Sequence, residues 1–321
     1  MTGNFDFIVG GVDIGGSKIA VGLATAIGRP LATEVLSNSP LEPLAAVADR
    51  VSAAILRMLA SSGAKTDRLL GIGIGCPGPL DVRTGRVLQD PTLPGWAGHS
   101  VTEAFASRLG VPCAIENDAD AALLGELFLG AAQGESDVAM LTVGNGVGGA
   151  LWLEGALVRG TQAEHPEVGH VPVLPDGPVC YCGQRGCLEA VAGGAFLNRY
   201  AQAIGIPDAV GLFEQDAAGY APARQLVDRA AAGIATAVAI LVHTAAPRTI
   251  LLGGGIIEKH YDRRAGPAQA LLAELTLIKH LKISLRPAAL GNKAGLLGAC
   301  RIGLDAGVRS PRKYLARRHS A

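Results

Sequence analysis

Residues 11–24 read GVDIGGSKIAVGLA, and the order of apolar residues and glycines in this stretch decides the fold class. The runs at residues 7–13 and 19–24 are apolar, and residues 15–18 between them form a Gly-Gly-Ser-Lys turn. This pattern predicts a strand, a tight turn and a second strand. A similar stretch, LTVGNGVGGALWLEG, occupies residues 141–155. Two such hairpins suggest two related halves of the molecule, although a chain with 44 glycines can contain both by chance.

Helical and strand patterns alternate along the rest of the chain. Ser39 is a suitable N-cap for a helix over about residues 40–61, because apolar residues recur there at helical spacing and Glu42 completes a capping box. Apolar runs between glycine-rich turns predict strands at residues 69–74, 111–116, 137–143 and 249–252, and helices at residues 118–131 and 222–246. This alternation predicts an α/β protein.

The composition bounds the class of protein. The chain has 321 residues, of which 49% are hydrophobic and 17% charged, so a sizeable core is expected. The 28 acidic and 28 basic side chains balance, which gives no indication of a nucleic-acid partner. No run of about 18 apolar residues is free of glycine and charge, and the first residues do not resemble a leader. We therefore expect no membrane span and a cytoplasmic location.

A cluster of thiols lies in EVGHVPVLPDGPVCYCGQRGCLE, residues 167–189. Cys180, Cys182 and Cys187 have the spacing C-x-C-x4-C, and His170 precedes them. Three thiolates and one imidazole form a common tetrahedral zinc site, and four protein ligands leave no open position, so such a zinc would be structural. A redox pair would need the spacing C-x-x-C, which is absent here, while free buried thiols remain an alternative.

Two aspartates occupy positions suited to chemistry. Asp13 ends a predicted strand just before two glycines, where backbone N–H groups can bind phosphate and a carboxylate can hold Mg²⁺. Asp118 follows Asn117 at a predicted strand-to-helix junction, where a carboxylate can accept the proton of an alcohol during phosphoryl transfer. The alternatives are an ordinary glycine hairpin and a plain helix N-cap.

The stretch E-x-G-H followed by C-x-C-G-x-x-G-C-x-E resembles the signature of the ROK family, which contains bacterial sugar kinases and sugar-responsive repressors. Other stretches are similar to family motifs and follow in the usual order from about residue 9 to 300. They are GVDIGGSK (11–18), GCPGPLD (75–81), ENDAD (116–120), GNGVGG (144–149), LLGGGI (251–256) and NKAGLLGA (292–299).

The resemblance implies roles for the matching residues. Asp118 would be the catalytic base, and sugar contacts would come from Gly78, Asn117, Asp118, Glu167, His170 and Glu189. The nucleotide would be bound by Asp13, Gly15, Gly16, Ser17, Lys18, Gly144, Asn145, Gly146, Gly253, Gly254 and Gly255. Zinc would be bound by His170, Cys180, Cys182 and Cys187. Trp96 is a further candidate for the sugar site, and a packed core position is at least as expected for it.

The resemblance also implies a two-lobed, actin-like ATPase fold with a central cleft. We expect a small lobe over residues 1–118, with a C-terminal helix at about 301–321 packing back on it, and a large lobe over residues 119–300. The expected cofactors are Mg-ATP and a structural zinc ion. The expected partners are a sugar and a second copy of the chain, without nucleic acid.

Departures from the family pattern keep the substrate open. Ser17 and Asn145 stand where the family usually has threonine, and His165-Pro166 precedes Glu167 where many glucose-type members have small residues. Phosphorylation of the primary hydroxyl of glucose is the favoured activity. N-acetylmannosamine, N-acetylglucosamine, fructose and mannose are alternative acceptors. A sugar-binding regulator and a sugar sensor without turnover are alternatives of another class, but the first phosphate motif begins at Gly11, so we expect no preceding segment for DNA binding.

Overall fold

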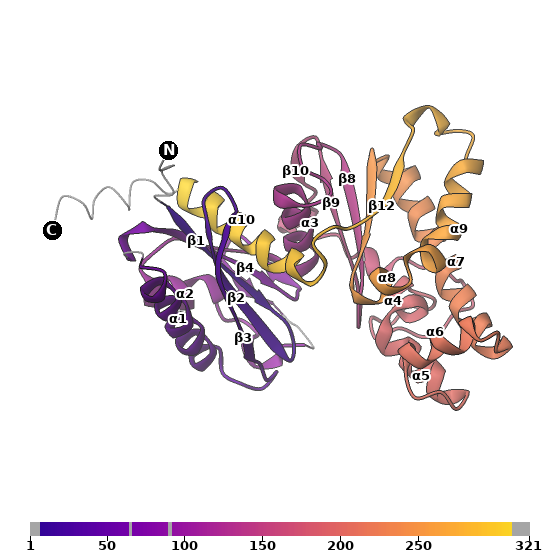
Figure 1. Ribbon diagram of the computed structural model, residues 1–321, viewed down its shortest axis with the longest axis horizontal. Coiled ribbons are helices and arrows are strands. Elements are labelled where there is room, and N and C mark those ends of the chain that lie inside the picture. Colours follow the sequence, from indigo (N-terminus) through magenta and orange to yellow (C-terminus); the bar gives the residue numbers. More distant parts are fainter. Residues whose placement is uncertain (1–6, 64–65, 89–91, 310–321) are drawn as a thin grey trace. The chain divides into compact units, whose positions relative to one another are not determined.

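The computed structural model describes residues 7–63, 66–88 and 92–309 (Figure 1). The chain divides into two compact units. The first unit consists of Met1–Gln133, Arg159–His165 and Lys293–Ala321, and the second of Gly134–Val158 and Pro166–Asn292. The units change over at residue 133, whereas the sequence analysis placed a lobe boundary at residue 118.

The first unit contains a five-stranded sheet in the order β3-β2-β1-β4-β7. Its strands are β1 (Ile8–Ile14), β2 (Lys18–Thr25), β3 (Pro30–Ser37), β4 (Leu69–Cys76) and β7 (Cys113–Asn117). Strand β1 pairs antiparallel with β2 and parallel with β4, and β4 pairs parallel with β7. The register pairs Asp13 with Gly75, and Gly75 with Glu116. The carboxyl ends of β1, β4 and β7 therefore meet at one edge, where α/β proteins usually bind ligands.

Helix α10 (Ala294–Arg309) covers this sheet and packs against β1, β4 and helix α3 (Asp118–Leu129) (Figure 1). Close approach requires glycine on both sides of the contact. A Cβ atom on Gly73 of β4 would collide with the Ala299 carbonyl, and one on Gly298 would collide with the Ala121 carbonyl. Because α3 packs on α10, it belongs to the first unit. Residues 310–321 of the helix expected at about 301–321 lie outside the described residues.

The other elements of the first unit correct one expectation. They are α1 (Leu44–Ser61), α2 (Val101–Leu109) and the short strands β5 (Leu80–Asp81) and β6 (Arg86–Val87). The predicted start of the first helix at residue 40 is wrong, because the helix begins at Leu44 with Pro43 as its N-cap. A proline disfavours the helical conformation in the residue before it, so Glu42 stays outside the helix.

The second unit repeats the sheet of the first. Its five strands run in the order β10-β9-β8-β11-β12. They are β8 (Val138–Val143), β9 (Val147–Leu153), β10 (Ala156–Leu157), β11 (Thr249–Gly253) and β12 (Ser284–Pro287). Strand β8 pairs antiparallel with β9 and parallel with β11, and β11 pairs parallel with β12. The similarity of the two hairpins, which the sequence suggested, therefore extends to both whole sheets.

The helices of the second unit include a long apolar helix, α7. They are α4 (Leu188–Ala192), α5 (Gly194–Ala203), α6 (Ala209–Ala217), α7 (Ala221–Ala245), α8 (Gly255–Lys259) and α9 (Tyr261–Glu274). By length and composition alone, α7 could span a membrane, and 56% of its apolar window is buried. It packs against α4, α6 and α9, and a buried core helix meets the same criteria.

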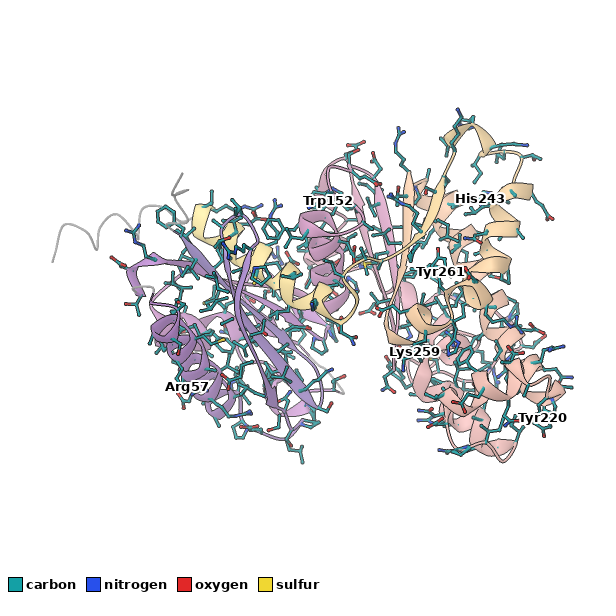
Figure 2. The ribbon with its side chains drawn as sticks, in the orientation of Figure 1. Arg57, Trp152, Tyr220, His243, Lys259 and Tyr261 are labelled. Carbon is teal, nitrogen blue, oxygen red and sulfur yellow. The ribbon has the colours of Figure 1, made fainter. Side chains whose placement is uncertain are left out.

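Each unit has its own hydrophobic core, and side chains surround the ribbon of each (Figure 2). Trp96 belongs to the core of the first unit, where it is fully buried. Its indole N–H donates to the carbonyl oxygen of Glu42 at 2.9 Å. Trp96 is therefore a packed core residue, the alternative that the sequence analysis weighed against a place in the sugar site.

Candidate functional site

The first glycine turn joins β1 to β2. The Gly15 N–H donates to the Lys18 carbonyl oxygen at 2.9 Å, which closes the turn, and Ser17 and Lys18 are exposed. The Asn38 side chain, just after β3, donates to the Gly15 carbonyl oxygen at 2.7 Å. A side chain from a third strand thus fixes the turn. Sequence reasoning missed Asn38, and its only local signal is a polar residue at the end of a strand.

Asp13 lies beside this turn under a closely packed helix. A Cβ atom on Gly295, at the start of α10, would lie 2.7 Å from Asp13 Oδ2. Burial, followed by the negative charge of Asp118, raises the pKa of Asp13 to about 6, while Lys18 acts in the opposite direction. Two carboxylates that repel each other at a strand edge suit a divalent cation, because hard cations prefer oxygen ligands and relieve the repulsion. The residues present therefore fit Mg²⁺.

Asn117 and Asp118 begin helix α3. Asn117 is buried and acts as the N-cap, since its Oδ1 accepts the Ala119 N–H at 2.8 Å. The structure brings Gly78 to it, because a Cβ atom on Gly78 would lie 3.4 Å from Asn117 Nδ2. Asp118 also accepts the Ala119 N–H at 2.8 Å, and its side chain is exposed. The N-cap alternative is thus correct for Asn117, and Asp118 still presents a carboxylate to solvent.

A cluster of charged side chains flanks Asn117 and Asp118 in the sequence and contacts the start of α3. The Arg159 guanidinium donates to Glu116 and, at 2.6 Å, to Asp120. His165 Nδ1 lies 3.1 Å from the same Asp120 oxygen. Burial raises the pKa of Glu116 to about 7 even though Arg159 acts in the opposite direction. His165, the departure that left the sugar open, therefore contacts the base of α3. Sequence reasoning missed Arg159.

The second glycine turn joins β8 to β9 and is held by backbone bonds. The Gly144 N–H donates to the Gly146 carbonyl oxygen at 2.9 Å. The first N–H groups of α5 donate to the turn, from Gly194 to the Gly144 oxygen at 2.9 Å and from Ala195 to the Asn145 oxygen at 2.8 Å. Asn145 is exposed. The polar residue that replaces threonine here thus faces solvent rather than the core.

The glycines at 253–255 lie next to this turn, because β11 pairs parallel with β8. Gly254 has a φ of 97°, and a Cβ atom there would lie 2.5 Å from the Val143 carbonyl oxygen. Only glycine adopts this conformation at this distance without strain. The structure therefore brings together the two glycine stretches of the second unit that the sequence assigned to the nucleotide.

Glu189 connects the thiol-rich loop to the second turn. Its Oε2 accepts the Val147 N–H at 2.9 Å, and its side chain is buried. A Cβ atom on Gly146 would lie 2.8 Å from the same oxygen. Glu167, which precedes the short helix Val168–His170, is exposed. A predicted sugar contact and a predicted phosphate turn are thus in direct contact.

The four predicted zinc ligands converge. The ligand atoms of His170, Cys180, Cys182 and Cys187 all lie within 4.8 Å of one another. His170 Nδ1 is 3.5 Å from Cys180 Sγ, and Cys182 Sγ is 3.5 Å from Cys187 Sγ. Three sulfurs and one imidazole nitrogen at these separations fit a tetrahedral zinc ion. The opposite ring nitrogen of His170, Nε2, lies 3.2 Å from the Tyr181 hydroxyl, a contact that sequence reasoning missed.

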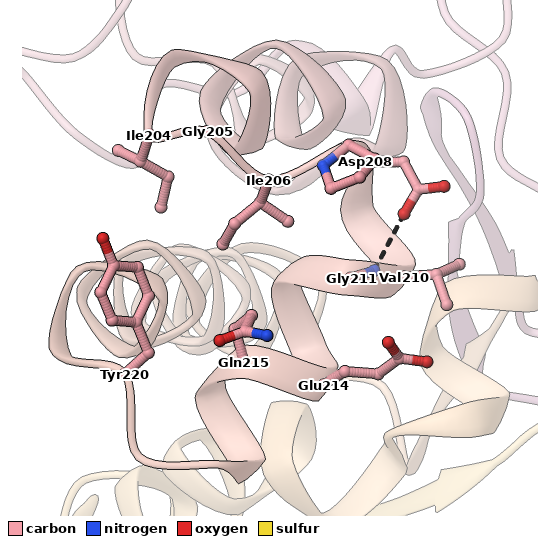
Figure 3. A pocket seen from close by; sticks show the side chains of 10 residues that line it. Ile204, Gly205, Ile206, Asp208, Val210, Gly211, Glu214, Gln215 and Tyr220 are labelled. Carbon is pink, nitrogen blue, oxygen red and sulfur yellow. Dashed lines mark hydrogen bonds between the residues drawn. The ribbon is translucent and has the colours of Figure 1, made fainter.

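A hollow of about 560 Å³ lies elsewhere on the second unit, beside α6 (Figure 3). It is lined by the loop before α6, by α6 itself and by Tyr220, and it contains none of the predicted site residues. Its Asp208 carboxylate accepts the Gly211 N–H at 2.9 Å and so serves as the N-cap of α6. This hollow carries no functional assignment.

Comparisons with known proteins identify the family and similar sugar kinases. The family model described as "ROK family" matches residues 9–305. A glucokinase of Thermotoga maritima is 32% identical, over 91% of this chain and 96% of that protein. The solved structure of a ROK hexokinase from Thermus thermophilus matches with a TM-score of 0.81 and 37% identity, covering 92% of this chain and 98% of that one.

A second solved structure shows a relative with its ligands. A ROK family glucokinase from Streptomyces griseus, in complex with glucose and AMPPNP, matches with a TM-score of 0.72 and 29% identity, covering 93% of this chain and 99% of that one. The similarity to these structures confirms the two-lobed, actin-like ATPase fold expected from the sequence.

Proposed function

The chain belongs to the ROK family, and we propose that it transfers the terminal phosphoryl group of ATP to the primary hydroxyl of a hexose, with glucose as the favoured acceptor. The protein is an ATP-dependent sugar kinase. Two similar glucokinases, one of them crystallised with glucose and an ATP analogue, support glucose over the other candidate sugars. A cytoplasmic location and a homodimer remain predictions.

The observation that carries the proposal is the pair of aspartates at the strand edge of the first unit. Asp118 is exposed at the first residue of α3, and its charge helps to raise the pKa of Asp13. Asp118 takes the proton of the attacking hydroxyl, because a carboxylate suffices as base when the transition state is loose. Asn117, fixed as the N-cap, holds the backbone at Asp118 and presents its amide to a sugar hydroxyl.

The nucleotide is bound by the glycine turns. Backbone N–H groups of such turns bind phosphate oxygens, and exposed Ser17 and Lys18 add polar groups to the first turn. Asp13 is the residue that would hold the metal ion. Mg²⁺, when bound with ATP, balances the charge of the phosphate groups.

The thiol-rich loop supplies the remaining sugar contacts. His170, Cys180, Cys182 and Cys187 would hold a structural zinc ion, which orders the loop and takes no part in the chemistry. His170 then binds the metal through Nδ1 and keeps Nε2 for a sugar hydroxyl. The carboxylates of Glu167 and Glu189 accept hydrogen bonds from further sugar hydroxyls.

A panel of sugars tests the proposed function. ADP release from Mg-ATP is measured with glucose, fructose, mannose, N-acetylglucosamine and N-acetylmannosamine, and without sugar. Release that depends on one or two sugars, glucose first among them, is the expected result. Release that is equal with and without every sugar, from protein shown to contain zinc, contradicts the proposal and favours a sensor without turnover.

A further inference from the structure

We propose that the Tyr181 hydroxyl occupies the place of a substrate hydroxyl at His170 Nε2, and that sugar must displace it. Tyr181 is then a specificity-determining residue, because its hydroxyl competes with the sugar and lowers the affinity for it. This inference rests on the proposed function, because it names the same sugar contacts. The residues concerned all belong to the second unit.

The first step concerns the two ring nitrogens of His170. Nδ1 lies 3.5 Å from Cys180 Sγ, and Nε2 lies 3.2 Å from the Tyr181 hydroxyl. The two rings meet edge to face, with centroids 5.2 Å apart and planes at 89°. Nδ1 is the nitrogen that would bind zinc, and with zinc there the proton would be on Nε2. Nε2–H would then donate to the Tyr181 oxygen.

The second step concerns the Tyr181 hydroxyl. A phenol has one O–H donor and an oxygen that accepts, and this oxygen lies 3.2 Å from His170 Nε2. A sugar hydroxyl has the same pair of capacities, so the two groups compete for the same histidine nitrogen.

The third step concerns which partner moves. His170 is half-buried, and its Nδ1 faces the thiols of the loop. Tyr181 is 66% exposed and lies in the exposed stretch between Cys180 and Cys187. A largely exposed ring loses little packing when it turns away. The imidazole is therefore the fixed partner, and the tyrosine is the one that moves.

Tyr181→Phe tests the proposal, because it removes the competing hydroxyl and keeps the ring. Sugar dissociation constants are measured by calorimetry without ATP for the wild type and the variant, with the same sugars as in the ADP-release panel. A net hydrogen bond corresponds to roughly a three- to tenfold change in affinity, so sugar is expected to bind about three- to tenfold more tightly to the variant. Zinc content should stay at the wild-type level. Tyr220→Phe, which changes an exposed tyrosine beside α6, is the matched control and should leave the affinity unchanged.

A spectroscopic measurement in the wild type is independent of the affinity. With ring-labelled tyrosine, the NMR signal that is missing in Tyr181→Phe belongs to Tyr181. This signal should shift when sugar saturates the protein, and the Tyr220 signal should not.

The outcomes separate the two proposals. Unchanged or weaker sugar binding by Tyr181→Phe, with zinc retained, overturns the role of Tyr181 and leaves the proposed function in place. A wild-type protein that contains zinc and binds none of the sugars overturns both.

Discussion

The two glycine turns of this protein stand at the same place in sheets of the same strand order, yet they are held in different ways. The first turn is fixed by the Asn38 side chain and lies beside the aspartates at residues 13 and 118. The second turn is fixed by backbone N–H groups of α5 and by contact with Glu189. One scaffold thus supports two tasks. The first unit carries the proposed base, and the second connects a proposed phosphate turn to a proposed sugar contact.

Removing the carboxylate of Asp118 should have the largest effect on turnover. This substitution tests the role that the comparison gives to the first unit. Asp118→Asn is expected to lower kcat by about 10²- to 10⁴-fold, because the variant cannot accept the hydroxyl proton. Sugar affinity should stay within about twofold of the wild type, since the amide keeps the hydrogen-bonding shape. Coupled ADP release and calorimetry measure the two quantities. Asp49→Asn, at an exposed position of α1, is the control, and wild-type turnover in Asp118→Asn would exclude Asp118 as the base.

Disrupting the thiol cluster tests the role that the comparison gives to the second unit. Cys182→Ser is expected to lower zinc from about one ion per chain to a small fraction, because a hydroxyl is a poor replacement for a thiolate. Sugar affinity should fall by about tenfold or more as His170 loses its orientation. Elemental analysis and calorimetry provide the measurements. Cys113→Ser changes a thiol outside the cluster and should retain zinc, and full zinc in Cys182→Ser would remove it from the ligand set.

Substitutions in the two turns should sharpen the comparison with smaller effects. Asn38→Ala removes the side-chain bond to Gly15, so the KM for ATP is expected to rise about three- to tenfold while the KM for sugar stays unchanged. Gly146→Ala should raise the KM for ATP and the KM for sugar, because its Cβ would press on Glu189 Oε2. Initial-rate kinetics with each substrate varied in turn measure the two KM values. An equal rise in both constants for Asn38→Ala would show that the two turns do not act separately.

The pH dependence of stability concerns folding rather than turnover, and it belongs to the first unit. Because burial raises the pKa of Glu116 from 4.5 to about 7, the folded protein holds more protons than the unfolded chain between these values. The free energy of unfolding therefore falls as pH rises through this window, by up to about 1.4 kcal/mol per pH unit for one proton. Glu116→Gln should flatten this dependence. Urea unfolding at pH 5, 6 and 7 measures it, and an unchanged slope would assign the dependence to another group.

Local patterns in the sequence predicted the parts of this molecule that depend on neighbours in the chain. The alternation of runs and turns gave the α/β class, and the spacing of Cys180, Cys182 and Cys187 gave the convergence of the thiols. The strand end at Asp13 and the junction at Asp118 also lie where the pattern put them. Each of these depends on period, turn chemistry or spacing, which a single stretch of sequence records.

Contacts between distant segments were not predictable in this way. Arg159 reaches Glu116 across 43 residues, and Asn38 reaches Gly15 across 23. An arginine or asparagine in a loop looks the same in sequence whether it is solvated or bound. Tyr181 lies between two cysteines whose spacing already predicts a metal site, so no pattern in the sequence points to its hydroxyl. The partner of each of these side chains is set by tertiary packing.

Helix α10 has a consequence for how the protein is made. It is encoded after the whole second unit, yet it covers β1 and β4 and lies against α3. During translation the sheet of the first unit therefore emerges from the ribosome with one face uncovered, and it waits in that state until the second unit has been synthesised. A chain released before residue 294 has been added would keep an exposed apolar sheet, which is the kind of surface that chaperones and proteases recognise.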